Sequence, residues 1–219
     1  MLIIDKYIPF VKETIGQTVL PDWQQVQVSA LEPEEITPQA VRNADALMVR
    51  TRTKINRELL EGSSVRLVAT ATIGYDHIDQ DYCRKTGIAW LSCPGCNAQA
   101  VCDYVEEALL EQKIPLNAKK IGIVGVGHVG TLVAQMAERY GMQVLLNDPP
   151  RNIGVSLDEI AHNCDVITFH TPLTRDGQYP TYHLCDEAFL QQCKPEALII
   201  NAARGGIVDE MALLRTKHP

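Results

Sequence analysis

The segment Ile121–Gly130 constrains the fold of this chain more than any other stretch. It is an apolar run, Ile121 to Val124, followed by glycines at 125, 127 and 130 in the spacing G-x-G-x-x-G. Apolar residues then recur at helical spacing as far as Tyr140, and Gly141 is placed to end that helix. A strand, a glycine turn and a helix in this order predict the first half of a dinucleotide-binding βαβ unit.

An acidic residue stands at the position this unit requires. A second apolar run, Val144–Leu146, leads to Asp148, 18 residues after Gly130. The glycines would let backbone approach a pyrophosphate, and the acid would accept hydrogen bonds from ribose hydroxyls. Asp148 would repel a 2′-phosphate, so NAD is favoured over NADP, although Arg151 nearby weighs the other way. The alternative is a glycine turn that only packs helix on strand.

Strand and helix patterns alternate along the rest of the chain, which predicts an α/β fold with two doubly wound parallel sheets. We expect a flavodoxin-like domain over residues 1–96, a linking helix over 97–112, and a Rossmann NAD-binding domain over 113–219. The domain boundary is placed at the break Ile114–Asn117. Strands are predicted at 2–4, 26–29, 46–49, 65–71, 88–91, 121–124, 144–146, 165–169 and 197–200, and helices at 8–16, 38–44, 56–60, 77–85, 97–112, 129–140, 156–164 and 186–193. Thr37 and Asn56 are expected to be N-caps of the second and third of these helices.

The composition restricts the classes of partner. The net charge is −7 and the pI about 5.4, which argues against nucleic-acid and anionic-membrane surfaces. No apolar run reaches the roughly 18 residues of a membrane span. The N-terminus lacks the basic region and apolar core of a signal peptide. We therefore expect a cytoplasmic protein.

The cysteines suggest one local site. Their number, seven, is odd, which makes a disulfide framework unlikely in such a chain. Cys93-Pro-Gly-Cys96 has the C-x-x-C spacing of a redox pair or of half a zinc site. No second set of ligands completes a tetrahedral site, so no metal is predicted. A loop between a strand and a helix is the favoured interpretation.

Polar residues follow several predicted strands, where ligands of open α/β sheets bind. Arg204 lies between an apolar strand and two glycines, a position from which it can bind an anionic substrate and polarise a carbonyl. A surface arginine beside a turn is the alternative. His170 is a candidate acid or base, but a loop histidine that holds backbone is favoured. Arg50, Arg52 and Lys54 suit a phosphate or carboxylate pocket, and a solvated basic loop is equally consistent.

Taken together, these segments resemble the D-isomer-specific 2-hydroxyacid dehydrogenases. Ala71–Asp79 resembles that family's substrate loop and Gly125–Gly130 its NAD turn. His170–Leu173 resembles its cofactor-side loop, and Asn201–Gly206 its catalytic-arginine segment. Further segments narrow the resemblance to a branch that oxidises a phosphorylated 2-hydroxy acid: 45–54, 69–72, 93–98, 124–127, 147–150 and 168–173.

The resemblance implies hydride transfer from the 2-hydroxyl carbon of that acid to NAD, and a homodimer for the whole protein. It implies that Arg204 is catalytic and holds the substrate carboxylate and carbonyl. The implied substrate contacts are Arg50, Thr51, Arg52, Thr72 and Gly74. The implied NAD contacts are Gly125, Gly127, His128, Val129, Gly130, Asp148, Thr171, Ala202, Ala203 and Arg204.

One part of the family pattern has no match. The family supplies a glutamate and a histidine after the arginine segment, and the histidine takes the hydroxyl proton. No such motif lies between Arg204 and Pro219, and His218 does not stand in one. By this resemblance, residues 1–96 are the substrate domain, and the NAD-binding domain over 113–219 is expected to be incomplete at its C-terminus. We therefore expect a truncated chain. Two alternatives stay open: another 2-hydroxyacid dehydrogenase that acts on glycerate-type acids, or a non-catalytic nucleotide-binding remnant.

Overall fold

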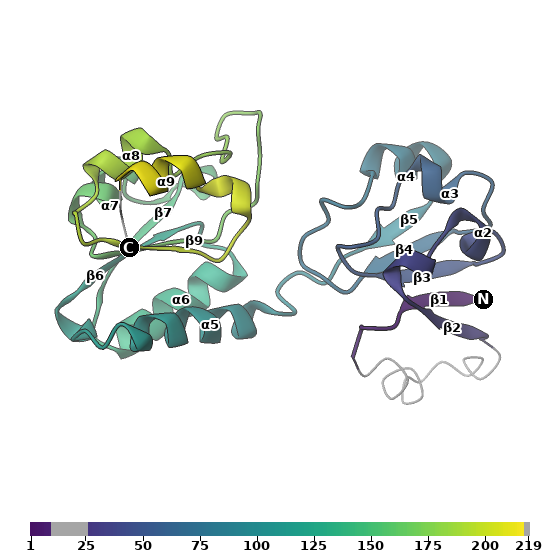
Figure 1. Cartoon of the computed structure of the whole chain (residues 1–219), viewed down its shortest axis with the longest axis horizontal. Helices are drawn as coiled ribbons and strands as arrows, with labels where there is room; N and C mark the ends of the chain where they lie inside the picture. The colour runs from purple at the N-terminus through teal and green to yellow at the C-terminus, as the bar shows by residue number, and fades with distance from the viewer. Residues whose placement is uncertain (10–25, 217–219) are drawn as a thin grey trace. The chain divides into compact units, whose positions relative to one another are not determined.

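The computed structural model describes residues 1–9 and 26–216, in two compact units, Met1–Cys96 and Asn97–Pro219 (Figure 1). The helix expected over 8–16 falls largely outside the described residues, and His218 falls there entirely. The division comes ahead of the break at 114–117 where we placed the boundary. The long helix α5 (Ala98–Glu111) is the reason, because it packs on α6 (His128–Arg139) within the second unit.

The first unit is a five-stranded parallel sheet with short helices. Its strands lie in the order β2-β1-β3-β4-β5, which is the flavodoxin-like order 2-1-3-4-5. Its core holds apolar side chains of the sheet and helices, among them Leu47 and Ile55, both fully buried. The elements are β1 (Leu2–Asp5), β2 (Val28–Leu31), the 3-10 turn η2 (Pro33–Glu35), α2 (Pro38–Val41), β3 (Ala46–Val49), α3 (Arg57–Leu60), β4 (Leu67–Thr70), α4 (Gln80–Thr86) and β5 (Ala89–Leu91).

Short polar side chains start the helices of this unit. Thr37 Oγ1 accepts from the backbone N–H of Ala40 at 3.3 Å, and Asn56 Oδ1 accepts from that of Leu59 at 3.1 Å. Both caps were predicted, and both are confirmed. The start of α4 at His77 was wrong. Asp79 caps that helix by accepting from the N–H of Tyr82, so α4 begins at Gln80.

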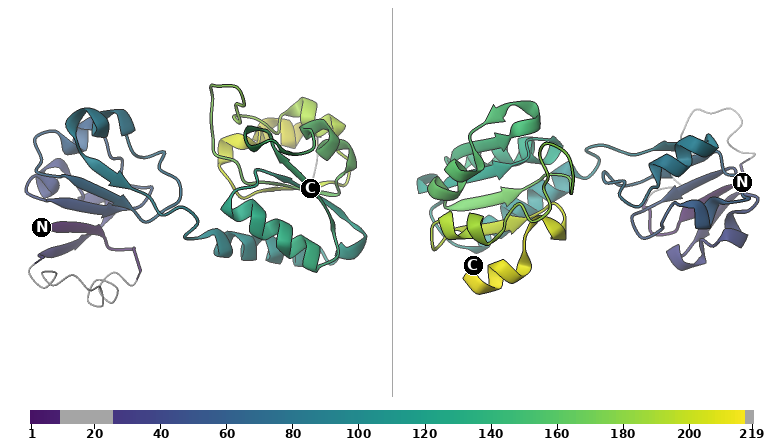
Figure 2. Two further views of the ribbon diagram at one scale, coloured as in Figure 1. Left: turned by 180° about the vertical axis from the view of Figure 1, so that it is seen from behind. Right: turned by 90° about the horizontal axis from the view of Figure 1, so that it is seen from above.

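The second unit is a five-stranded sheet in the order β10-β9-β6-β7-β8. Helices α5 and α6 cover one face, and α7, α8 and α9 lie on the other (Figures 1 and 2). Its remaining elements are the 3-10 turn η3 (Leu116–Ala118), β6 (Lys120–Val124), β7 (Gln143–Asp148), the 3-10 turn η4 (Pro149–Arg151), β8 (Ile153–Gly154), α7 (Leu157–Asn163), β9 (Val166–Phe169), α8 (Glu187–Gln192), β10 (Leu198–Asn201), the 3-10 turn η5 (Gly205–Ile207) and α9 (Glu210–Thr216).

Each unit thus has a sheet dominated by parallel strands, as the fold class predicted. One strand departs from that prediction. β8 pairs with β7 in the antiparallel direction, with Asn147 opposite Gly154 and Asp148 opposite Ile153. If β6 is counted as strand 1, the second sheet runs β8-β7-β6-β9-β10. This is the 3-2-1-4-5 strand order of the dinucleotide-binding fold. Its switch point lies at β6, which pairs with β7 on one side and β9 on the other.

Candidate nucleotide-binding site

The glycine turn between β6 and α6 owes its shape to three glycines with different tasks. Gly125 has a φ of +92°, and a Cβ there would lie 2.9 Å from the backbone of His170 and Thr171. A Cβ on Gly130 would lie 2.0 Å from Gly125 O, so this glycine lets α6 approach the turn. A Cβ on Gly127 would meet nothing within 4 Å. The turn therefore has one open face, where a ligand can reach its backbone.

Helix α6 adds unpaired donors to that face. Its N-cap, Gly127, has no side chain, and no acidic residue stands in the first turn. The first N–H groups of the helix, including those of His128 and Val129, have no partner within the helix. A helix N-terminus in this state favours a negatively charged group such as a phosphate.

Asp148, at the end of β7, holds the same turn. Its Oδ2 accepts from the backbone N–H of Val126 at 2.9 Å. Arg151 donates from Nη1 to the carbonyl of Val126, the other side of that residue. Asp148 and Arg151 thus fix Val126 together. Sequence reasoning missed Val126, whose side chain carries no signal for a role that only its backbone performs.

The loop after β9 closes the turn from the other side. His170 donates its backbone N–H to Val124 O at 2.8 Å, and its Nε2 lies 3.0 Å from Thr168 Oγ1. Burial lowers the pKa of His170 to about 4, so the ring is neutral near pH 7. Among the described residues, His170 Nδ1 and Thr171 Oγ1 are buried without a hydrogen-bond partner. Thr171 Oγ1 is therefore a polar atom for which a bound ligand could supply the partner.

Arg204 follows β10, beside the end of β9, since Asn201 pairs with Phe169. The side chain of Asn201 shapes this loop: Nδ2 donates to Arg204 O at 2.9 Å, and Oδ1 accepts from the N–H of Ala203 at 3.1 Å. Arg204 is exposed and donates from Nη1 to Ala203 O at 3.1 Å. Sequence reasoning missed the part of Asn201, although an Asn at a strand end is itself a turn signal.

The segment after Arg204 is held by main-chain contacts with residues 183–185. His183 N–H donates to Gly206 O at 2.8 Å, and Cys185 N–H donates to Ile207 O at 3.0 Å. The sequence pattern does not reveal this pairing, because the two segments lie far apart along the chain. The pairing fixes the path of the backbone just beyond Arg204.

The basic loop of the first unit is largely committed to ion pairs. Arg50 forms two hydrogen bonds with the buried carboxylate of Asp5, from Nε at 3.0 Å and from Nη2 at 3.3 Å. This assigns Arg50 a structural partner that its implied role as a substrate contact did not anticipate. Arg52 pairs with Glu34 at 2.9 Å, and both side chains are about two-thirds exposed. Thr51 and Lys54 are exposed.

The loop after β4 is ordered by its own hydroxyl groups. Thr70 Oγ1 and Thr72 Oγ1 share a hydrogen bond of 2.7 Å, and Thr72 Oγ1 donates to Gly74 O at 2.9 Å. Thr72 and Gly74 are therefore brought together, although by a contact with each other. Both residues are partly exposed.

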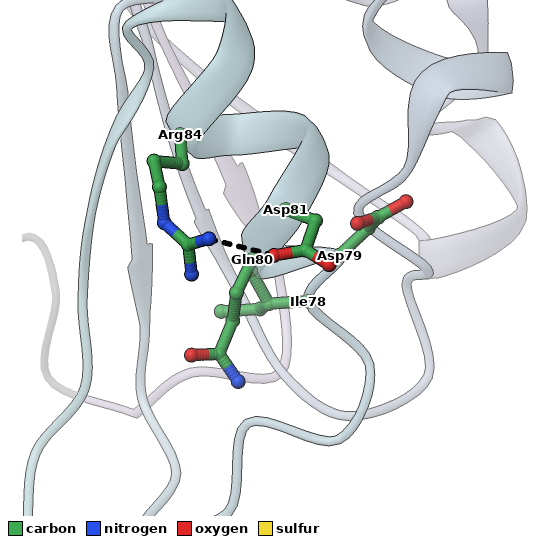
Figure 3. A pocket seen from close by; sticks show the side chains of 5 residues that line it. All are labelled: Ile78, Asp79, Gln80, Asp81 and Arg84. Atoms are coloured by element: carbon green, nitrogen blue, oxygen red, sulfur yellow. Dashed lines mark ion pairs between the residues drawn. The ribbon is translucent and has the colours of Figure 1, made fainter.

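A hollow of about 340 Å³ lies at the start of α4 and is a poor candidate for an anionic ligand (Figure 3). Asp79 and Asp81 line it, and Asp81 pairs with Arg84 at 2.9 Å. Two carboxylates beside one arginine that is already paired do not attract a phosphate. The other lining residues are Ile78 and Gln80.

No cluster of three or more His, Cys, Asp or Glu side chains suited to a metal ion occurs within residues 1–9 and 26–216. No helix in that part of the chain has the length and apolarity to cross a membrane. Cys93 and Cys96 are free and exposed, whereas the other five cysteines are buried.

Residues 99–217 match the family model described as "D-isomer specific 2-hydroxyacid dehydrogenase, NAD binding domain". The chain is also similar to erythronate-4-phosphate dehydrogenases over nearly its whole length. It is 46% identical to that of Bacteroides fragilis, covering 97% of this chain and 62% of the relative. It is 43% identical to that of Cronobacter sakazakii, covering 97% of this chain and 57% of the relative. The chain thus spans about three-fifths of the length of these relatives.

Two solved structures share its architecture. NAD⁺-bound 3-phosphoglycerate dehydrogenase of Entamoeba histolytica matches with a TM-score of 0.83 and 26% identity, over 98% of this chain and 76% of that one. D-Lactate dehydrogenase of Aquifex aeolicus, complexed with NAD and lactic acid, matches with a TM-score of 0.76 and 24% identity, over 99% and 73%. The second likeness bears on the fold alone.

Proposed function

The chain belongs to the D-isomer-specific 2-hydroxyacid dehydrogenases, and from this membership we propose that it serves the NAD-dependent oxidation of 4-phospho-D-erythronate. The product would be 3-hydroxy-2-oxo-4-phosphooxybutanoate. The reaction would be a step of pyridoxal 5′-phosphate biosynthesis. The observation that carries the proposal is 46% identity to an erythronate-4-phosphate dehydrogenase across both units. Because the chain spans 62% of that relative, the oxidation and a homodimeric state are proposed for the whole protein.

The cofactor site lies in the second unit. Backbone N–H groups of the glycine turn and of His128 and Val129 would hold the pyrophosphate. Asp148 keeps one carboxylate oxygen on Val126 and offers the other to the ribose hydroxyls. Thr171 Oγ1, buried and unpaired within the described chain, would gain its partner from the cofactor. The residues present thus fit NAD, which supplies a hydride acceptor when bound. Ala202 and Ala203 would complete the lining beside Arg204.

Arg204 would act on the substrate. Its exposed guanidinium can form paired hydrogen bonds with a carboxylate and donate to the oxygen at C2. As the hydride leaves C2 and the proton leaves the hydroxyl, that oxygen becomes a carbonyl, and a fixed positive charge stabilises the developing negative charge. The guanidinium of Arg204 has N–H donors and no acceptor, so another group must take the proton.

The hydroxyl proton needs a separate acceptor. His170 does not suit this task, because its ring is buried and its Nε2 is engaged with Thr168. A base with a pKa of about 4 is also a weak proton acceptor near pH 7. The family resemblance places this task on a histidine paired with a glutamate. We assign it to none of the described residues.

We propose Arg52, with Thr51 and Thr72, as the substrate contacts of the first unit. Arg50 is less suitable, because Nε and Nη2 of its guanidinium are already engaged by the buried carboxylate of Asp5. Arg52 pairs with an exposed carboxylate, and such a pair contributes little and exchanges easily. A bound phosphate can therefore compete with Glu34 for the guanidinium.

Two variants separate these roles. In the product of the complete gene, Arg52→Ala should raise KM for 4-phospho-D-erythronate about tenfold or more, the loss of one charged hydrogen bond, and leave stability unchanged. Arg50→Ala should instead lower the free energy of unfolding by roughly 3–5 kcal/mol, because it removes the positive charge paired with the buried carboxylate of Asp5. An unchanged KM in Arg52→Ala would remove that residue from the substrate site.

The proposed function itself is tested in two steps. Calorimetry should show NAD binding to the 219-residue chain. The complete gene product should then form NADH with 4-phospho-D-erythronate, and more slowly with 3-phosphoglycerate at equal concentration. Binding without turnover in the complete protein would support a nucleotide-binding role alone. Preference for 3-phosphoglycerate would support a glycerate-type dehydrogenase, in keeping with the likeness to the Entamoeba enzyme.

A further inference from the structure

The segment Cys93–Cys96, between β5 and α5, forms a tight turn. The backbone N–H of Cys96 donates to Cys93 O at 3.2 Å, and Gly95 has a φ of +82°. Proline at the second position and a positive-φ glycine at the third are the marks of a type II turn. The composition Cys-Pro-Gly-Cys therefore has a local conformational reason, and the two cysteines are the ends of the turn.

The turn brings its end residues within bonding range. The Cα atoms at the two ends of such a turn lie less than about 7 Å apart. A disulfide requires a Cα separation of roughly 4.4–6.8 Å. Pro94 fixes its own φ, and Gly95 adopts the positive φ of the turn without strain. Little conformational freedom is therefore lost when a disulfide joins Cys93 and Cys96.

Accessibility separates these two thiols from the rest. Cys93 and Cys96 are exposed, and Cys83, Cys102, Cys164, Cys185 and Cys193 are buried. Burial raises the pKa of Cys164 and of Cys185 to about 12, and that of Cys193 to about 11. Buried thiols of this kind are poorly ionised and shielded from reagents.

We propose that Cys93 and Cys96 are a dithiol modification site that closes to an intramolecular disulfide with small disulfide oxidants such as oxidised glutathione. One thiolate attacks the oxidant, forms a mixed disulfide and releases one glutathione. The second thiolate attacks the mixed disulfide, forms the Cys93–Cys96 bond and releases the second glutathione. Two protein thiols are thereby oxidised, and one glutathione disulfide is reduced to two thiols.

The modification would act on a defined neighbour. The backbone N–H of Cys93 points to Thr72 O at 3.5 Å, so the turn lies against the loop after β4. Closing the disulfide would hold this end of the turn in place. The site depends on the geometry of the turn alone and stands whether or not the proposed substrate is correct.

The test counts thiols in the intact 219-residue chain. The reduced native protein should show two thiols that react rapidly with Ellman's reagent, and none after treatment with oxidised glutathione. Alkylation of the oxidised, unfolded chain should then leave one label on the tryptic peptide 86–113, at Cys102, with fragmentation placing the bond between 93 and 96. Three labels, or a bond that includes Cys102, would overturn the proposal.

Two single variants control for the second step. Cys93→Ser and Cys96→Ser each leave one exposed thiol, which should stop at a stable mixed disulfide with one glutathione. The unsubstituted chain should carry no glutathione at the end of the reaction. A mixed adduct that persists in the unsubstituted chain would show that the two sulfurs cannot meet.

Discussion

Gly127 and Gly130 stand three residues apart in one motif, yet an added methyl group meets different surroundings at each. Gly130→Ala places a Cβ 2.0 Å from Gly125 O, so helix and turn must separate. We expect a loss of roughly 1–3 kcal/mol in the free energy of unfolding. Gly127→Ala meets no atom within 4 Å, so its cost is that of a poorer N-cap, about 1 kcal/mol or less.

NAD affinity tests the role of Gly127. In Gly127→Ala the methyl group occupies the open face, and NAD affinity should fall about tenfold to a hundredfold, the equivalent of a charged hydrogen bond. Urea unfolding and calorimetry on both variants provide the measurements. A Gly127→Ala chain that binds NAD as tightly as the parent would show that the pyrophosphate does not approach this face.

His170 gives a prediction for pH. Burial holds its pKa at about 4 in the folded chain, against 6.5 for the exposed group. The unfolded chain therefore binds a proton first as the pH falls, and stability is lost between about pH 6.5 and pH 4. The loss amounts to about 2 kcal/mol between pH 7 and pH 5. His170→Gln should lack this component in urea unfolding at the two pH values, and equal losses in both chains would contradict it.

At the residue scale, the sequence predicts what is local. The glycine turn, Asp148 and the caps at Thr37 and Asn56 follow from spacing over a few residues. The partner of Arg50 does not, because Asp5 stands 45 positions earlier and meets it only once β1 and β3 pair. A cluster of positive charges in a sequence therefore says little about which of them are free.

At the scale of elements, the hairpin of β7 and β8 was the feature without a clear sequence signal. β8 has two residues, too few for an apolar period to be visible. Its glycine is the reason it can pair: Gly154 has a φ of +83°, and a Cβ there would lie 1.8 Å from Leu146 O. Asn147 Nδ2 donates to Val155 O at 2.6 Å and closes the hairpin.

Gly154→Ala should open this hairpin and displace Asp148, which pairs with Ile153 in its ladder. We expect weaker NAD binding together with a lower unfolding midpoint. Gly177→Ala is the matched control, since Gly177 also has a positive φ, +98°, and a Cβ there would meet nothing within 4 Å. Gly177→Ala should lower the unfolding midpoint, because alanine is strained at a positive φ, and should leave NAD affinity unchanged. Equal effects of both variants on NAD binding would argue that the hairpin does not position Asp148.

At the scale of the whole molecule, the two units have separate cores. Leu47 is fully buried in the first, and Leu109 of α5 is fully buried in the second, next to α6. The periodicity of α5 predicted a helix with one apolar face but could not say which unit covers that face. The βα alternation predicted doubly wound parallel sheets. The order of the strands within each sheet follows from the pairings in the structure.

Replacement of each leucine by alanine tests the division after Cys96. Each replacement should lower the free energy of unfolding by about 2–5 kcal/mol. Hydrogen exchange should show which unit is destabilised. Leu47→Ala should speed exchange within residues 26–96, and Leu109→Ala within 97–216. Faster exchange of the first unit in Leu109→Ala would place α5 with that unit instead.

Asp148 and Arg151 both hydrogen-bond the backbone of Val126, and this has a consequence for changing the cofactor preference. An acid at the end of the second strand repels a 2′-phosphate, so a change of cofactor from NAD to NADP starts with that residue. Here that acid also anchors the backbone of the turn, together with Arg151. Removing the side-chain acceptor at position 148, as alanine would, loosens the turn that grips either cofactor. An effective change would keep an uncharged acceptor at position 148, such as serine or asparagine, and leave Arg151 in place to meet the added phosphate.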